Sequence, residues 1–111
     1  MSHQEAANRA AICSVALWNA RGSIDALTTP LNNIPAVFYA ARASDVRINL
    51  GLATSCLPDL GDPGIASQVQ QLEDLASNAR PDPGRIAEAA NRLRNHVRAA
   101  LLPSAEKMPI T

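Results

Sequence analysis

Apolar residues recur along this chain in steps of three and four, the spacing that places side chains on one face of an α-helix. Segments rich in Pro, Gly, Asn and Asp divide the pattern into four stretches. These cover about residues 2–28, 35–57, 65–80 and 83–103. No stretch alternates with the period of two expected for a strand. The pattern therefore predicts four helices and no sheet.

Capping signals support these boundaries. Ser2 with Glu5 three residues later forms a capping box, in which each side chain satisfies a free backbone donor. Asp82 before Pro83 pairs a capping side chain with the proline tolerated in the first helical turn. Gly22 and Ser23 mark a point where the first helix could bend. Pro103 should end the last helix, which leaves 104–111 as a mobile tail.

Each predicted helix carries one apolar stripe that should form the core. The stripes are Ala6, Ala10, Cys13, Leu17, Ala20, Ile24 and Leu27; Tyr39, Ala43, Val46, Leu50, Ala53 and Leu57; Ile65, Val69, Leu72, Ala76 and Ala79; and Ile86, Ala90, Leu93, Val97 and Ala100 or Leu101. Short connections favour antiparallel neighbours. The predicted fold is all-α, a single domain over 1–103: an up-down-up-down four-helix bundle with two long helices first and two shorter ones after.

Composition agrees with a small helical domain and narrows the function. The chain has 111 residues, of which 47% are hydrophobic and only 3% aromatic, a balance that depends on alanine. Its formal net charge of zero argues against nucleic-acid binding driven by bulk charge. No apolar run is long enough to span a bilayer, and the first residues lack the pattern of a secretory signal. A cytoplasmic protein without cofactors is the resulting expectation.

The two cysteines are predicted not to be bonded to each other. Cys13 and Cys56 lack the C-x-x-C spacing of a zinc or redox motif. If the first two helices form a hairpin centred near residues 31 and 32, Cys13 lies opposite about residue 50. Cys56 would then lie roughly 9 Å further along the axis, beyond the reach of a disulfide.

No catalytic or metal-binding motif is present, and a non-enzymatic protein is expected. His96 is the one histidine within a predicted helix face, and an exposed histidine beside arginines resembles that of a histidine phosphotransfer bundle. The residues after it, from Val97 to Ala100, lack the Lys and Gly that such domains usually carry. A structural, partly solvated histidine is therefore the favoured interpretation. Metal-ligand spacings such as H-E-x-x-H are also absent from the sequence.

A second apolar stripe on the first two helices is the main functional hint. A helix that is apolar around most of its circumference is either central in the fold or buried at an interface. The predicted interface residues are Ala11, Val15, Trp18, Val37, Phe38, Ala41, Ile48 and Leu52. They favour a protein-interaction or regulatory module that binds a protein partner and forms a homodimer, the commonest oligomer. Small helical domains of this size also occur as inhibitors, an association from size and fold alone.

Two other hypotheses remain open at this stage. A basic patch of Arg85, Arg92, Arg94 and Arg98 on the fourth helix could contact a nucleic acid, although the four side chains divide between two flanks of that helix. Phosphotransfer through His96 is the third. A last expectation concerns the turn between the first two helices: Leu31, Ile34, Val37 and Phe38 should protrude there, beyond the cover of the shorter helices.

Overall fold

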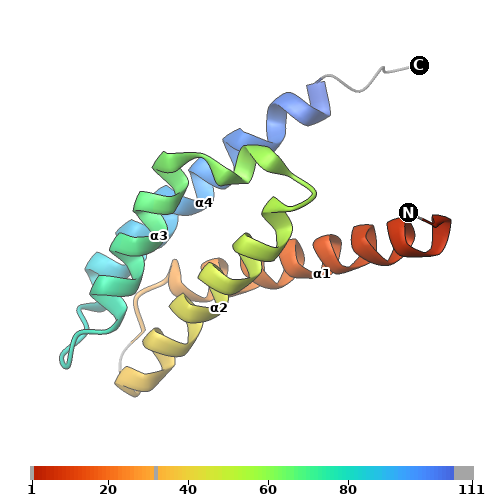
Figure 1. Ribbon diagram of the computed structural model, residues 1–111. Coiled ribbons are helices and arrows are strands. Elements are labelled where there is room, and N and C mark those ends of the chain that lie inside the picture. The colour runs from red at the N-terminus through yellow and green to blue at the C-terminus, as the bar shows by residue number, and fades with distance from the viewer. Residues whose placement is uncertain (1, 32, 107–111) are drawn as a thin grey trace.

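The computed structural model describes residues 2–31 and 33–106, which form four α-helices and one short 3₁₀ helix without a strand in these ranges (Figure 1). The elements are α1 (His3–Leu27), α2 (Ala36–Thr54), η1 (Pro58–Gly61), α3 (Pro63–Ala76) and α4 (Pro83–Glu106). Consecutive helices pack against each other, and α4 also packs against α1. The predicted all-α class and the antiparallel four-helix bundle are confirmed.

Side-chain caps begin three of the four helices. The Ser2 hydroxyl accepts a hydrogen bond from the Glu5 amide at 3.2 Å, as the capping box predicts. Both α3 and α4 start with the tripeptide Asp-Pro-Gly. In each, the aspartate carboxylate accepts a hydrogen bond from the backbone amide of the glycine. The distance between the two atoms is 2.6 Å for Asp62 and Gly64 and 3.0 Å for Asp82 and Gly84. The repeated tripeptide therefore acts as a helix-start signal.

The helix ends differ from the sequence prediction in three places, the first being α2, which ends at Thr54 instead of about Leu57. α3 ends at Ala76, before the predicted Arg80. α4 continues through Pro103 to Glu106, so the prediction that Pro103 stops it is wrong. A proline removes one backbone donor but does not forbid a helix from continuing. Residues 104–106 of the predicted tail thus belong to α4, and 107–111 lie outside the described residues.

The two long helices are the first and the last. α1 has 25 residues and α4 has 24, whereas α2 has 19 and α3 has 14. The prediction of two long and two shorter helices holds, but its assignment of the long pair to the first two was wrong. α1 also passes through Gly22 and Ser23 as one continuous helix.

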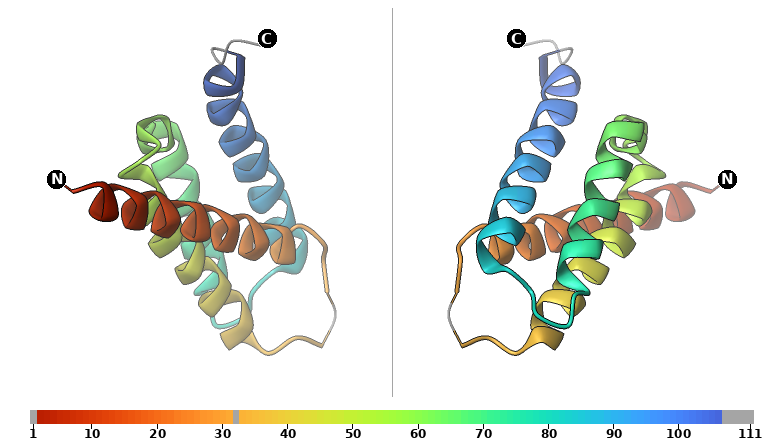
Figure 2. Two further views of the ribbon diagram at one scale, coloured as in Figure 1. Left: turned by 90° about the vertical axis from the view of Figure 1, so that its right-hand side faces the viewer. Right: turned by 90° about the vertical axis from the view of Figure 1, so that its left-hand side faces the viewer.

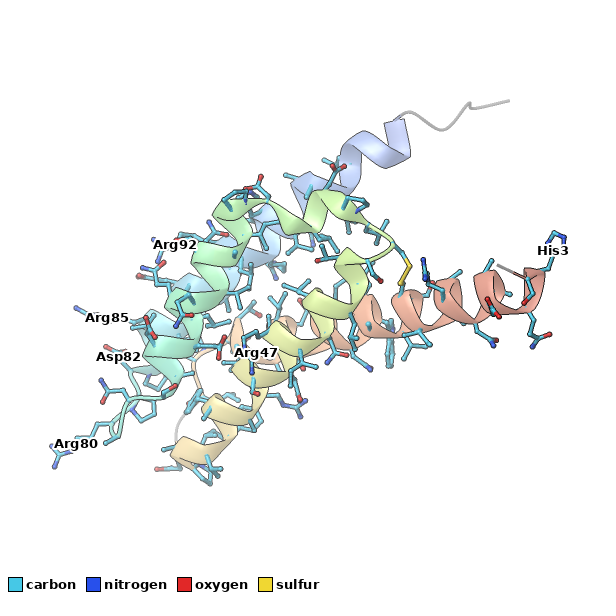
Figure 3. All side chains as sticks on the ribbon, viewed as in Figure 1. His3, Arg47, Arg80, Asp82, Arg85 and Arg92 are labelled. Carbon is cyan, nitrogen blue, oxygen red and sulfur yellow. A yellow bond between two sulfur atoms is a disulfide. The ribbon has the colours of Figure 1, made fainter. Side chains whose placement is uncertain are left out.

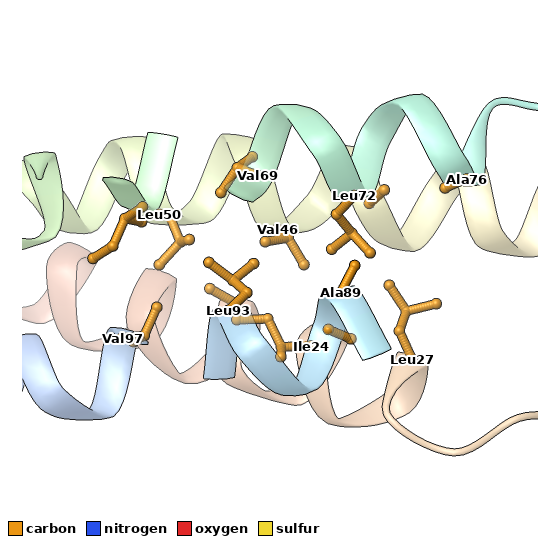
Figure 4. Close-up of a cluster of buried hydrophobic side chains, with 14 of the residues drawn as sticks. Ile24, Leu27, Val46, Leu50, Val69, Leu72, Ala76, Ala89, Leu93 and Val97 are labelled. Atoms are coloured by element: carbon orange, nitrogen blue, oxygen red, sulfur yellow. The ribbon is translucent and has the colours of Figure 1, made fainter. Parts of the chain in front are cut away.

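The core is built from the predicted stripes (Figure 4). Its most buried large side chains are Ile24, Leu27, Val46, Ile65, Leu72, Ile86 and Leu93. Alanines fill the crossings between them, with Ala20, Ala53 and Ala90 completely inaccessible to solvent. Three predicted core residues, Ala6, Ala10 and Ala79, are exposed instead.

The N-terminal half of α1 projects from the bundle. In Figure 2 this end of α1 points away from the other helices in both views. Every residue from Ser2 to Ile12 is exposed, and the first buried residue of the chain is Cys13. We call residues 3–12 the arm of α1. Ala6 and Ala10 fail as core residues because no other helix covers them, α2 reaching only the end of the arm at Ala11 and Ile12.

A disulfide joins Cys13 to Cys56 where the arm meets the bundle (Figure 3), contrary to the sequence prediction. The two Cα atoms are 6.2 Å apart. The assumed register was close, since Cys13 Sγ lies 3.7 Å from the Leu52 carbonyl oxygen. The error was to continue the helical rise to residue 56. α2 ends at Thr54, and the following turn carries Cys56 sideways toward α1 instead of further along the axis.

Candidate interaction surface

The second apolar stripe of α1 faces solvent. The Trp18 side chain is 75% exposed, and Val15 and Ile12 beside it are also exposed. Ala11 completes this row one turn earlier. A tryptophan so exposed is unusual, because its large apolar surface favours burial. The sequence interpretation had missed Ile12, which lies on the flank of the predicted stripe toward α2.

Two apolar residues of α2 extend this surface. Ile48 and Leu52 are exposed on the same stripe of α2. Leu52 lines a shallow depression of about 380 Å³ together with Ala11, Ile12 and Val15 of α1. We call Ala11, Ile12, Val15, Trp18, Ile48 and Leu52 the outer face. Of the predicted interface residues, Ala11, Val15, Trp18, Ile48 and Leu52 thus come together on two adjacent helices.

A larger polar cleft continues the outer face past Trp18. It has a volume of about 760 Å³ and lies between α1 and α2. Its charged lining residues are Arg21 and Asp25 from α1 and Arg42 and Asp45 from α2. Gly22 and Ala26, one and two turns after Trp18, also line it. The cleft therefore offers small residues beside the indole and equal numbers of cations and carboxylates.

The remaining predicted interface residues lie at the start of α2. Val37 is 72% exposed and Ala41 is exposed one turn later. Phe38 is half-buried against the core, with its ring edge-on to Tyr39 at 5.7 Å and the Arg42 guanidinium 5.3 Å above it. Phe38 is therefore already packed within its own chain, unlike Trp18.

The turn between α1 and α2 is tied to the bundle and does not protrude as predicted. The Tyr39 hydroxyl donates to the Leu31 carbonyl at 3.1 Å, and the Asn91 amide of α4 donates to the Thr28 carbonyl at 3.2 Å. Ile34 packs against the core, although Leu31 stays partly exposed. The prediction failed because it assumed that the third and fourth helices do not reach this tip, whereas Asn91 of α4 contacts the end of α1.

The arginines of α4 do not form one patch. Arg85 pairs with Asp82 at 4.0 Å, on the side of the molecule where Figure 3 also places Arg92. Arg94 and Arg98 instead line a cavity against α1. The four residues of the predicted basic patch are thus divided between two sides of the helix, as their spacing indicated.

The side chain of His96, on α4, packs against the start of α3. Its Nδ1 lies 3.1 Å from Gln68 Oε1, and its Nε2 lies 3.6 Å from a carboxylate oxygen of Asp62. The ring also occupies the space beside Gly64, where a Cβ would stand 2.7 Å from the imidazole Cε1. Because both ring nitrogens face partners from α3 and its cap, the arrangement favours the structural interpretation of His96.

The described residues contain no cluster of three or more His, Cys, Asp or Glu that could hold a metal ion. In the same part of the chain, no helix combines the length and apolar character needed to cross a membrane.

No protein family, curated protein or solved structure matches the chain in sequence or fold. Any assignment of function therefore depends on the geometry alone.

Proposed function

We propose that this protein is a non-enzymatic interaction module that forms a homodimer through the outer face and binds a protein partner by the same two helices. The exposure of Trp18, at 75%, in a row with the exposed Val15 and Ala11 carries this proposal. Aromatic residues at the centre of such surfaces commonly dominate interface energetics. Burying the indole and its neighbours would remove the largest apolar surface that α1 leaves in water.

A two-fold arrangement fits the residues around Trp18. In an antiparallel pairing of α1 with its copy, centred near Gly22, each indole lies against Gly22 and Ala26 of the other chain. Those residues carry little side chain, so the two helices can approach closely. The same pairing brings each Arg21 near the Asp25 of the other chain, and both residues line the cleft beside Trp18. A self-complementary surface of this kind is what an isologous dimer requires.

The arm supports the same proposal. A helical segment of ten residues is marginally stable in water when nothing packs against it. The arm has this character, since Ser2 to Ile12 are all exposed. An α1 pairing centred near Gly22 ends opposite about residue 17, so we assign the cover of the arm to the protein partner, which would reach it through Ala11 and Ile12. The nucleic-acid and phosphotransfer hypotheses receive no comparable support, given the divided arginines and the engaged ring of His96.

Trp18→Glu tests the proposal. We expect the wild-type protein to elute as a dimer in size-exclusion chromatography with light scattering, and the variant as a monomer with the same helical circular dichroism. Ala99→Glu on the exposed side of α4 is the matched control and should remain dimeric. A monomeric wild-type protein at millimolar concentration, or a dimeric Trp18→Glu variant, would overturn the homodimer.

The disulfide bears on the compartment in which the module works. Thiols are kept reduced in the cytosol, whereas disulfides persist in oxidising compartments. We therefore propose, against the cytoplasmic expectation, that the working form is the oxidised one with Cys13 bonded to Cys56. Alkylating free thiols in intact cells before lysis checks this: labelled cysteines in the native protein would instead support a cytoplasmic, reduced form.

A further inference from the structure

A second cavity, of about 210 Å³, lies between α1 and α4 and shares Arg21 and Asp25 with the cleft between α1 and α2. Its apolar lining comes from Ile24 of α1 and from Val97, Leu101 and Leu102 of α4. Three arginines, Arg21, Arg94 and Arg98, surround these residues, with Asp25 as the only carboxylate among the side chains that the structure describes there. The cavity therefore combines an apolar floor with an excess of positive charge.

The three arginines have no carboxylate partner within the part of the chain that the structure describes. In addition, Arg94 Nε is buried without a hydrogen-bond partner among those residues. A buried donor left unsatisfied costs stability unless something accepts its hydrogen bond. The polar cleft beside Trp18 differs, because its two arginines are balanced by two aspartates. Since Arg21 and Asp25 line both sites, the excess positive charge of the α1–α4 cavity comes from Arg94 and Arg98.

Helical spacing explains why cations and apolar residues alternate there. One face of α4 carries Arg94, Val97, Arg98 and Leu101, because these residues are related by spacings of three and four. Arg21, Ile24 and Asp25 are related in the same way on α1. Ile24 and Val97 are buried and form the floor, Arg21 and Arg98 are exposed at the rim, and Arg94 is partly buried between them.

We propose that this cavity binds a small amphiphilic carboxylate, with its tail on the apolar floor and its head among the three arginines. A planar guanidinium matches a carboxylate through two parallel hydrogen bonds. The volume suits a short tail, because 210 Å³ equals that of about seven water molecules and lies below the range of pockets for drug-sized ligands. A straight chain of about six carbons fits this space.

Calorimetric titration of the purified protein with hexanoate, butyrate, 1-hexanol and hexylamine tests the class of ligand. Hexanoate should bind on the order of tenfold more tightly than butyrate, because two further methylene groups leave water. Hexanol and hexylamine should bind far more weakly, since neither offers an anion to the guanidinium groups. Equal binding of hexanol and hexanoate, or no binding of hexanoate, would overturn the proposal.

Substitutions locate the site. Arg98→Gln and Arg94→Gln should each weaken hexanoate binding about 10- to 100-fold through loss of a charge-assisted hydrogen bond. Arg85→Gln on the same helix, outside the cavity, is the control and should bind like wild type. Arg98 is exposed, so its variant should fold even if removal of the partly buried Arg94 disturbs α4. Unchanged binding by Arg98→Gln would overturn the site.

The inference does not rest on the proposed dimer, although Arg21 and Asp25 line both the cavity and the cleft beside Trp18. Trp18 lines the cleft and not the cavity, whereas Arg94 and Arg98 line the cavity and not the cleft. Trp18→Glu should therefore bind hexanoate at least as tightly as wild type, because a monomer leaves Arg21 unengaged by a second chain. Loss of hexanoate binding in that variant would contradict the placement of the ligand between α1 and α4.

Discussion

The two halves of α1 have similar sequences and opposite surroundings. Both are rich in alanine, and both repeat apolar residues with helical spacing. From Cys13 to Leu27 that spacing buries six residues beneath α2 and α4, whereas in the arm it buries none. A hydrophobic period therefore indicates which residues share a face, but burial depends on which other helices reach that face.

The junction between the halves is where the disulfide lies. Cys13 is the first buried residue of α1, and its partner Cys56 comes from the turn after α2. The bond thus fastens α1 at the last point where another element covers it. Stability beyond this point must come from helix propensity, caps and any second molecule.

Breaking the disulfide should have the largest effect on the free energy of unfolding. A cross-link between residues 43 apart restricts the unfolded chain enough to be worth up to about 4 kcal/mol. Urea unfolding with and without a thiol reductant measures this loss. A double Cys13→Ala, Cys56→Ala variant is the control, because reductant should leave its unfolding curve unchanged. Free thiols in the mass spectrum of the air-oxidised protein would rule the bond out.

The loss in the free energy of unfolding should differ several-fold between matched truncations in the two halves of α1. Ile24→Ala removes a side chain that is 1% exposed and should cost about 3 kcal/mol through the cavity it leaves. Ile12→Ala removes the same atoms from a residue that is 57% exposed, and should cost less than about 0.5 kcal/mol in dilute protein. Similar losses in urea unfolding would mean that the arm is covered even in the monomer.

The two Asp-Pro-Gly helix starts allow a smaller, equally matched test. Gly64→Ala should destabilise the protein by about 1 to 2 kcal/mol, because the new Cβ would stand 2.7 Å from His96 and displace the ring. Gly84→Ala should be nearly neutral, since its Cβ would meet only the Asp82 carboxylate at 3.3 Å. Thermal unfolding of both variants checks this. A neutral Gly64→Ala would contradict the tight packing of His96.

The smallest effect should be a gain. Gly22→Ala introduces a methyl group that meets nothing within 4 Å, in the middle of an exposed helix surface. Alanine is the better helix former, so stability of the monomer should rise by about 0.5 to 1 kcal/mol. If Gly22 also lies at the dimer axis, the added methyl should weaken self-association in light scattering. A loss of monomer stability would contradict the open surroundings of Gly22.

The fold was largely predictable, and particular residues show where prediction stopped. The stripe from Tyr39 to Ala53 in α2 is buried as predicted, because helical period and core position coincide there. Ala6 has the same period but lies in the arm, and no local pattern reports how far a neighbouring helix extends. Cys56 was misplaced because a turn, unlike a helix, has no constant rise.

The candidate surface was predictable in part. Trp18 and Leu52 were recognised because a second apolar stripe is visible in the sequence. The α1–α4 cavity was not, since it joins Arg21 to arginines more than seventy residues away that had been considered only as a patch on α4. The packing of α4 against α1, which brings these residues together, is not visible in the pattern of either helix.

The disulfide also determines whether cleavage by a protease separates the chain into two fragments. In the connection between α1 and α2, residues 29–31 and 33 are exposed and not helical, the kind of segment that proteases cut most readily. That connection lies inside the loop closed by Cys13 and Cys56. A chain nicked there would keep both fragments covalently joined and would migrate as two pieces only on a reducing gel. A cut in the connection between α1 and α2 would therefore not separate the two parts of the chain while the disulfide is intact.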